Sequence, residues 1–292
     1  MKELIVTLKK HNLRTNSYET RGKAIIINSN KGKLVLKKRT NNIFDYLETR
    51  SFDYFPKYIK DDQYNIMEYI EDVEMPKEQK MLDLINLVSL LHNKTTYYKN
   101  VDEDDYKKHY EDIKNNINYL FNYYTDLMNI IETKIHMSPS EFLLATNISI
   151  VFNALRYCEY NLDSWYKDVL DKNRRRYVVI HNNLDLNHFI RNSNAYLLSW
   201  DKARMDIPVY DLYTLYKKYA LEYDFKDLFN VYEKKYPLLK DEKKLLYVLI
   251  SIPDKIELSD SIYDDCARIE RFLDYLYKTE ILISPENSEK TK

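Results

Sequence analysis

Four polar side chains in one short segment could do chemistry. Residues 181–190 read HNNLDLNHFI, which brings two imidazoles, an amide and a carboxylate close together in the chain: His181, Asn183, Asp185 and His188. An amide can orient a hydroxyl but cannot accept its proton, whereas a carboxylate can act as a base. Imidazole suits zinc, copper or iron, and magnesium prefers oxygen ligands. The segment therefore carries groups suited to proton transfer and to metal binding.

Apolar runs flank this segment and would position it. The run YVVI precedes it, and after the short run FI and a turn at 192–194 comes YLLSW, which Asp201 directly follows. Asp201 lies 18 residues after Asn183. The pattern predicts strand, polar loop, strand, turn and strand, an order that resembles the catalytic hairpin of kinase-like enzymes. In such a hairpin the loop places a base beside the attacking hydroxyl, and the later Asp binds the metal on the phosphates.

The hairpin resembles that of the aminoglycoside phosphotransferase and choline kinase superfamily. There the loop reads HGDxxxxN, and the following strand ends in [IL]DW[DE] or a close relative. His181 matches the motif's His, which usually supports the loop. Asn182 matches its Gly, Asn183 its catalytic Asp, and His188 its metal-binding Asn. Asp201 falls where the second metal-binding Asp is expected.

Two further stretches extend the resemblance. The run DIPVYDL, residues 206–212, resembles the family's D-x-P-x-x-D-L segment, in which the last Asp, here Asp211, buttresses the loop. Upstream, LVSLLH looks like the family's hhxxLH helix, and LVLK looks like the strand that ends in the nucleotide-binding Lys. Side chains alternate along a strand, so Lys37 rather than Lys38 would face the nucleotide. The resemblance implies Glu48 as the ion-pair partner of Lys37.

The resemblance implies an α+β chain with the bilobed protein-kinase-like fold. We expect a β-rich N-lobe over residues 1–72 and a helical C-lobe over 73–292, which contains the catalytic-loop remnant 181–211 and a helical insertion. The long insertion is most similar to the spore-coat kinase-like branch. The charged residues 174–176 indicate a solvated helix end. The expected elements are helices at 2–12, 43–52, 76–92, 103–131, 139–171 and within 209–282, with a hairpin at 23–28 and 33–38 and a strand at 63–70.

Composition excludes several classes of function. The 292 residues include 45 basic and 46 acidic side chains, so no net field would attract nucleic acid or anionic lipid. With only two glycines, the chain has no glycine-rich phosphate loop. Cys158 and Cys266 form no CxxC pair, which favours a reducing compartment. The longest apolar run, residues 245–252, is too short for a membrane span, and we expect a cytoplasmic protein.

The functional hypotheses depend on the altered residues of the loop at 181–190. The loss of the loop acid and amide indicates a degenerate kinase-like protein. Such a protein would be a pseudokinase with a binding or scaffolding role and an association with spores. It would bind ATP and a divalent metal, Mg or Mn, weakly or not at all, and its partner would be a small molecule or a protein. The alternative is an active phosphotransferase for a small-molecule hydroxyl, with Asp185 standing in as base or ligand. A third reading is an unrelated helical protein with a chance match.

Overall fold

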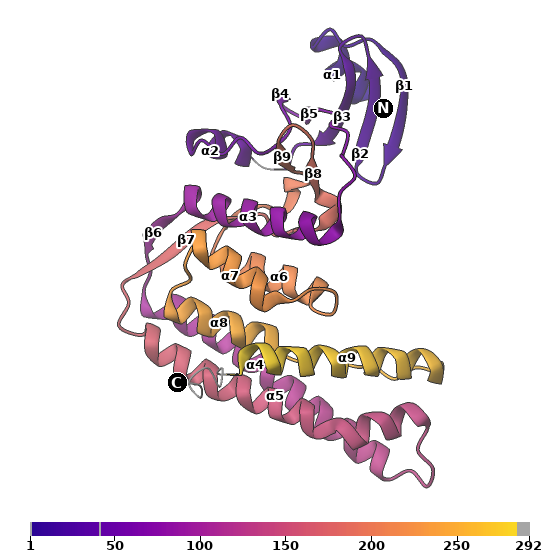
Figure 1. Ribbon diagram of the computed structural model, residues 1–292, viewed down its shortest axis with the longest axis vertical. Helices are drawn as coiled ribbons and strands as arrows, with labels where there is room; N and C mark the ends of the chain where they lie inside the picture. The colour runs from indigo at the N-terminus through magenta and orange to yellow at the C-terminus, as the bar shows by residue number, and fades with distance from the viewer. Residues whose placement is uncertain (1, 41, 285–292) are drawn as a thin grey trace. The chain divides into compact units, whose positions relative to one another are not determined.

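The computed structural model describes residues 2–40 and 42–284. The described chain divides into two compact units, each made of two chain segments. Unit 1 comprises residues up to 96 and residues 178–206, and unit 2 comprises residues 97–177 and those from 207 onward. Figure 1 labels most of the elements of both units. The predicted α+β class is confirmed, with an antiparallel sheet lobe and a helical lobe.

Unit 1 is built on a five-stranded antiparallel sheet with the strand order β1-β2-β3-β5-β4. Its strands and helices are β1 (Thr15–Arg21), β2 (Ala24–Ser29), β3 (Gly32–Lys38), β4 (Tyr58–Lys60), β5 (Tyr64–Glu68), α1 (Lys2–Lys10), α2 (Ile43–Thr49) and α3 (Lys77–Thr95). The predicted hairpin is confirmed, because β2 pairs with β3 around the turn between Ser29 and Gly32. Gly32 has φ 100°, a conformation that glycine adopts without strain.

The helix α1 covers the sheet through an apolar core. Residues of α1, of the sheet and of the segment between them form one buried cluster, consisting of Leu4, Leu8, Leu13, Ile27, Leu34, Leu36 and Ile66. Leu34 and Leu36 alternate with Val35 and Lys37 along β3. The two leucines therefore lie on one face of the strand, and Lys37 lies on the opposite face. The core therefore leaves the Lys37 face of β3 for other contacts.

The remainder of unit 1 is the segment around the predicted loop. It contains η1 (Leu186–His188), β8 (Phe189–Arg191), β9 (Ala195–Leu197), η2 (Trp200–Lys202) and β10 (Arg204–Asp206). The predicted strand, loop, strand, turn and strand are confirmed by the pairing of β8 with β9. The strand β7 (Arg174–Ile180) pairs with β10 through residues 178–180 and with β6 (Tyr97–Asn100) through residues 174–177. The division between the units thus falls within β7.

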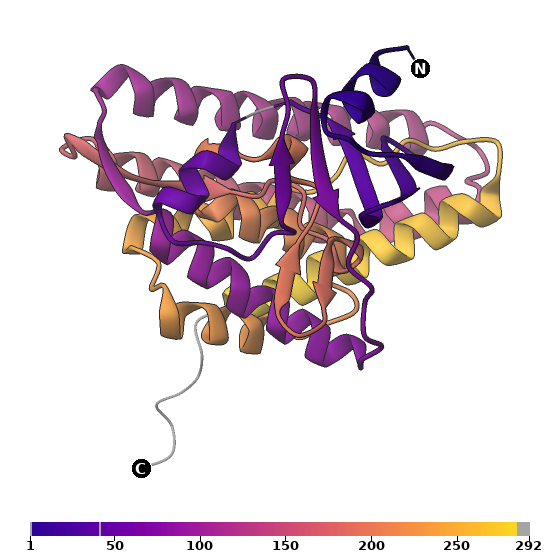
Figure 2. The same ribbon diagram turned by 90° about the horizontal axis from the view of Figure 1, so that it is seen from above.

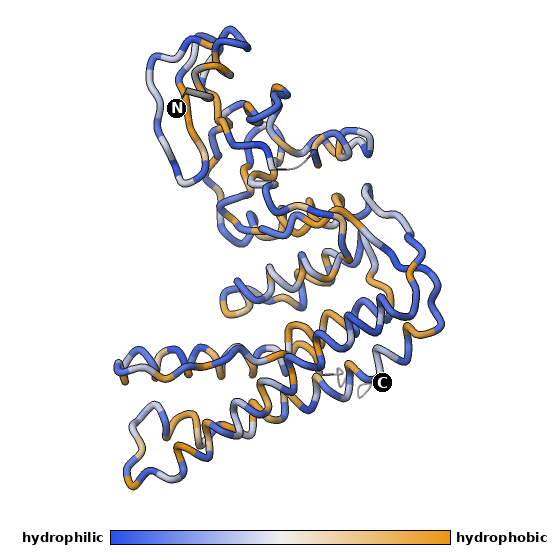
Figure 3. Tube along the Cα trace, turned by 180° about the vertical axis from the view of Figure 1, so that it is seen from behind, coloured by the Kyte–Doolittle hydropathy of each residue, from blue (hydrophilic) through white to orange (hydrophobic). Residues whose placement is uncertain are grey.

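Unit 2 is helical. Its helices are α4 (Glu103–Glu132), α5 (Pro139–Val169), α6 (Val209–Tyr219), α7 (Phe225–Lys235), α8 (Lys240–Ser251) and α9 (Ile262–Ile283). The helices α4 and α5 lie side by side (Figures 1 and 2), and α5 also packs on α8 and α9. Hydrophobic residues recur along these helices (Figure 3). Ser138 caps α5 in a capping box with Glu141, and Pro139 occupies its first turn, which explains why the helix begins there.

One sequence expectation about unit 2 is wrong. Residues 174–176 do not end a helix but form the first half of β7, and Arg176 is buried. Its Nε lies 2.9 Å from Glu242 Oε1, and its guanidinium lies over the ring of Tyr236. A buried charge is tolerated when it is paired and hydrogen-bonded, and the partner here comes from a helix 66 residues away in the chain. The local sequence therefore could not indicate that Arg176 is buried.

Candidate functional site

Lys37 and Asp201 form the centre of the candidate site in unit 1. Lys37 Nζ lies 2.9 Å from Asp201 Oδ2 and 3.1 Å from Ser199 Oγ. The two charged side chains are 16% and 29% exposed, so the ion pair is only partly screened by water. Lys38, the next residue of β3, is exposed. The strand thus directs Lys37 to the predicted metal-binding residue.

Ser199 is a member of this site that the sequence analysis missed. It has φ 63°, in the left-handed region that residues other than glycine seldom adopt, and it directly precedes η2. The signal was present in the motif [IL]DW[DE]: aligned with residues 198–201, it matches Ser199 to its Asp and Asp201 to its last position. A hydroxyl therefore stands where that motif has its Asp, and Asp201 lies two positions after the place at which the metal-binding Asp is expected.

The loop begins with His181 and Asn182. His181 is fully buried, with Nε2 2.8 Å from the backbone oxygen of Leu198, and its ring meets the Trp200 ring edge-on at 4.7 Å. These contacts tie the start of the loop to the strand end that carries Asp201. Asn182 has φ 53°, so it takes the conformation that the motif's Gly would supply. Asparagine tolerates this region better than most residues.

His188 is held against the backbone of Asn183. Its Nδ1 lies 2.8 Å from the Asn183 carbonyl oxygen. A carbonyl only accepts hydrogen bonds, so Nδ1 carries the hydrogen, and the Nε2 of the neutral ring has a lone pair. The backbone contact closes the loop over five residues. The roles of His188 as a metal ligand and of Asn183 in orienting a hydroxyl stay predictions.

Asp185 shapes the loop. Its side chain is buried and accepts a hydrogen bond of 2.7 Å from the Asn187 N–H, which caps the short helix η1. A carboxylate that caps a turn is fixed in position by that bond, because rotating away would leave the N–H unsatisfied. The stand-in role that we predicted for Asp185 as base or ligand would compete with this contact.

Glu48 and Asp211 have other surroundings. Glu48, on α2, lies 3.9 Å from Lys60 Nζ, and within the described chain Lys37 pairs with Asp201 rather than with Glu48. The predicted Lys37–Glu48 ion pair thus differs from the observed one, because Lys60 on β4 supplies the cation near α2. Asp211 belongs to unit 2, where it is buried in the first turn of α6. Its support of the loop stays a prediction.

The residues present fit a metal only together with a nucleotide. Among the described residues, no group of three or more His, Cys, Asp or Glu side chains is placed to hold a metal ion. Magnesium in nucleotide sites is commonly held by one or two carboxylates together with phosphates, and keeps several waters. Asp201 can supply one such carboxylate, and the Lys37 ammonium can contact phosphate. The described residues alone do not offer a complete metal site in this region.

Comparison with known proteins supports the fold. No protein-family model matches the chain, and none of the curated protein sequences matches it either. Among solved structures, it is similar to an aminoglycoside phosphotransferase from Alicyclobacillus acidocaldarius, with a TM-score of 0.65 and 9% identity over 92% of this chain and 91% of that one. It is also similar to a spectinomycin phosphotransferase bound to AMP, with a TM-score of 0.54 and 12% identity over 97% and 95%. The chain therefore has the kinase-like fold that these aminoglycoside phosphotransferases share.

Proposed function

We propose that this chain is a pseudokinase of the aminoglycoside phosphotransferase fold, which binds a nucleotide at Lys37 and Asp201 and does not efficiently transfer its phosphate. The contact between Lys37 Nζ and Asp201 Oδ2 carries the nucleotide-binding part of the proposal, because it brings the predicted phosphate-binding cation to the predicted metal-binding carboxylate. The similar spectinomycin phosphotransferase was crystallised with AMP, and with ADP and spectinomycin. A nucleotide would exchange the Lys37–Asp201 contact for contacts to its own phosphates and metal.

The loop supports weak or absent transfer. Asn183 offers no proton acceptor at the position of the motif's base, and Asp185 already caps η1. Ser199 replaces a carboxylate beside Asp201, so a metal would meet one protein carboxylate where the motif supplies two acidic residues. Magnesium and manganese should therefore add little to nucleotide affinity. The binding or scaffolding role, the cytoplasmic location and the association with spores stay predictions from the sequence.

An active small-molecule phosphotransferase is the second candidate. One observation favours it: the Lys37–Asp201 pair is in place, and phosphoryl transfer depends mainly on positioning and electrostatics. Losing a general base typically costs about 10²–10⁴ in rate and does not by itself abolish turnover. Transfer of the γ-phosphate to any hydroxyl compound, lost in Asp201→Ala, would establish this candidate and overturn the pseudokinase proposal.

Thermal unfolding with nucleotide tests the binding step. We expect millimolar ATP to raise the Tm, since a ligand at ten times its Kd stabilises by about 1.4 kcal/mol. Lys37→Met should abolish the increase and Asp201→Asn should reduce any part that depends on metal. Lys38→Met is the matched control, because its side chain is exposed on the same strand, and it should keep the full increase.

Two results would count against nucleotide binding. No change in Tm at millimolar ATP, with or without magnesium or manganese, would remove the basis of the proposal. An equal increase in the wild type and in Lys37→Met would place the nucleotide elsewhere. The Tm of each variant without nucleotide shows whether the substitution itself alters folding.

A further inference from the structure

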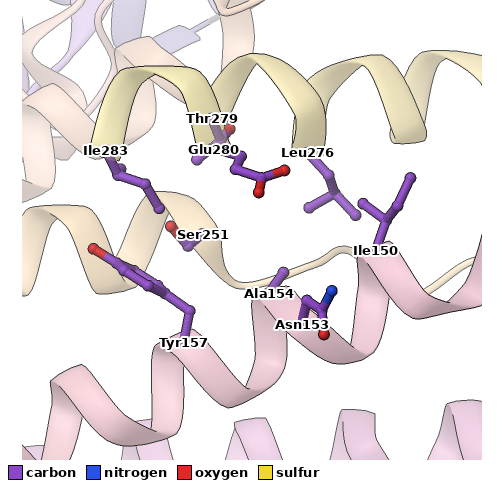
Figure 4. A pocket seen from close by; sticks show the side chains of 9 residues that line it. All are labelled: Ile150, Asn153, Ala154, Tyr157, Ser251, Leu276, Thr279, Glu280 and Ile283. Atoms are coloured by element: carbon purple, nitrogen blue, oxygen red, sulfur yellow. The ribbon is translucent and has the colours of Figure 1, made fainter. Parts of the chain in front are cut away.

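A pocket of about 140 Å³ lies between three helices of unit 2. Figure 4 shows its lining side chains, which come from α5, from the end of α8 and from the last turns of α9. The wall is largely apolar and includes Ile150, Leu276 and Ile283. A cavity of about 150 Å³ holds a molecule the size of benzene, so this pocket has room for a ligand body of about six carbons.

Glu280 supplies the charge of the pocket. Its side chain extends from α9 toward α5 (Figure 4). Within the described residues no cationic side chain forms an ion pair with it. Tyr157 is the other titratable residue among the nine that line the pocket, and burial raises its pKa to about 12, so its phenol is neutral at neutral pH. The pocket thus presents one negative charge beside an apolar wall.

Ser251 provides a second, independent indication of a ligand. Its hydroxyl is buried at the end of α8, lines the pocket, and has no hydrogen-bond partner within the described structure. Buried polar groups nearly always have a partner, and an unmade hydrogen bond is unfavourable. The Asn153 side chain, also in the lining, accepts a long hydrogen bond of 3.4 Å from Arg156, which leaves acceptor capacity on its oxygen.

We propose that this pocket binds a small amine whose apolar body has about six carbons, with its ammonium group against Glu280. An ammonium group has three donors and no acceptor. One donor suits the Glu280 carboxylate, and the others suit hydroxyl or amide oxygens such as those of Ser251 and Asn153. The apolar body would cover the wall formed by Ile150 and Leu276. The site does not rest on the proposed nucleotide binding, because all its residues belong to unit 2.

Cyclohexylamine is the probe for this site, with cyclohexanol and cyclohexanecarboxylate as its neutral and anionic counterparts. Isothermal titration of the full chain without nucleotide should give a Kd on the order of 1 mM for the amine. The alcohol should bind more weakly, and the carboxylate should not bind at the same concentrations. Equal affinity for all three compounds would overturn the proposal.

Variants then locate the binding. Glu280→Gln should weaken cyclohexylamine binding about fivefold and leave cyclohexanol binding unchanged, since it removes an exposed charge and keeps the shape. Ala154→Leu narrows the pocket and should weaken both compounds. Glu270→Gln is the matched control on the same helix, where Glu270 is exposed and outside the lining, and it should bind as the wild type does. An unchanged amine affinity in Glu280→Gln would refute the site.

Discussion

Asn182 shows how a single residue can keep a backbone shape after its motif letter has changed. The resemblance assigns a Gly to this position, and the structure gives Asn182 φ 53°, in the left-handed region. Its Nδ2 also lies 3.4 Å from the Lys202 carbonyl oxygen, a long hydrogen bond back to the strand end near Asp201. The loop thus keeps its turn because asparagine, among residues with a side chain, adopts this conformation at low cost.

Replacing Asn182 separates the backbone strain from the side-chain contact. Both Asn182→Ala and Asn182→Gly lose the hydrogen bond, but only Ala must hold an ordinary side chain in the left-handed region. We therefore expect the Ala variant to be about 1 kcal/mol less stable than the Gly variant, measured by urea unfolding. Asn187→Ala, at an exposed side chain of the same loop, is the control and should change stability by less than about 0.5 kcal/mol. Equal stability of the Ala and Gly variants would show that the loop relaxes.

At the scale of elements, Asp61 fastens α1 to the turn between β4 and β5. Its side chain is 3% exposed and lies 3.0 Å from both Lys10 Nζ and His11 Nε2. It also accepts hydrogen bonds from the backbone N–H groups of Gln63 and Tyr64. Burial alone would raise the pKa of Asp61, but the hydrogen bonds from Gln63, His11 and Lys10 outweigh it and lower the pKa well below its ordinary value. The ionised form is therefore the one that stabilises the folded state.

The lowered pKa of Asp61 predicts a loss of stability in acid. A carboxyl group with a lower pKa in the folded state contributes fully above its unfolded pKa of about 3.9, and the contribution disappears as the pH falls below that value. At pH 7 we expect Asp61→Asn to lower the free energy of unfolding by about 2 kcal/mol, and the difference from the wild type to shrink below pH 4. Urea unfolding of the wild type and of Asp61→Asn at pH 7, 5 and 3 measures the difference in the free energy of unfolding.

Asp62 offers the control for that experiment. It lies 3.0 Å from the same Lys10 Nζ, but its side chain is 90% exposed. Exposed ion pairs contribute little, so Asp62→Asn should leave both the stability and its pH dependence nearly unchanged. A loss that is as large for Asp62→Asn as for Asp61→Asn would show that Lys10, rather than the buried hydrogen bonds, is responsible.

Elements with a buried face could be predicted, and those without one could not. The helix α3 repeats apolar residues at helical spacing, and the predicted face is buried along its length. The strand β1 is exposed at every residue and has no face to bury. Its sequence, TNSYETR, therefore needs no alternation of apolar and polar residues, and it shows none that would indicate a strand. It forms because β2 offers its backbone along the whole length. Arg176 was misjudged for the related reason that its buried partner, Glu242, lies far away in the sequence.

In the candidate site, too, local patterns could be predicted from the sequence, and the contact between distant residues could not. The spacing between the loop and Asp201 predicted a kinase-like hairpin, and the alternation along β3 predicted that Lys37 rather than Lys38 faces inward. The contact between Lys37 and Asp201 joins residues 164 positions apart, and no local pattern specifies which carboxylate meets the lysine. The resemblance suggested Glu48 as the partner of Lys37, whereas the observed pair lies between β3 and the segment after β9.

At the scale of the whole molecule, the two proposed ligands belong to different units. Lys37 and Asp201 lie in unit 1, and Glu280 lies in unit 2. A ligand that binds only the folded form stabilises the region whose opening would destroy its site. Within the described chain, no helix combines the length and apolar character needed to cross a bilayer.

Hydrogen exchange with each ligand can therefore tell the two sites apart. ATP should slow amide exchange in β3 and in residues 181–201, whereas cyclohexylamine should slow exchange in α5, α8 and α9. Lys37→Met should remove the first pattern only, and Glu280→Gln should weaken the second only. Because each unit consists of two chain segments, either ligand should protect peptides that are distant in sequence but belong to one unit. Protection that spreads equally over both units would mean that they open as a single cooperative body, and the ligands would then be coupled through folding.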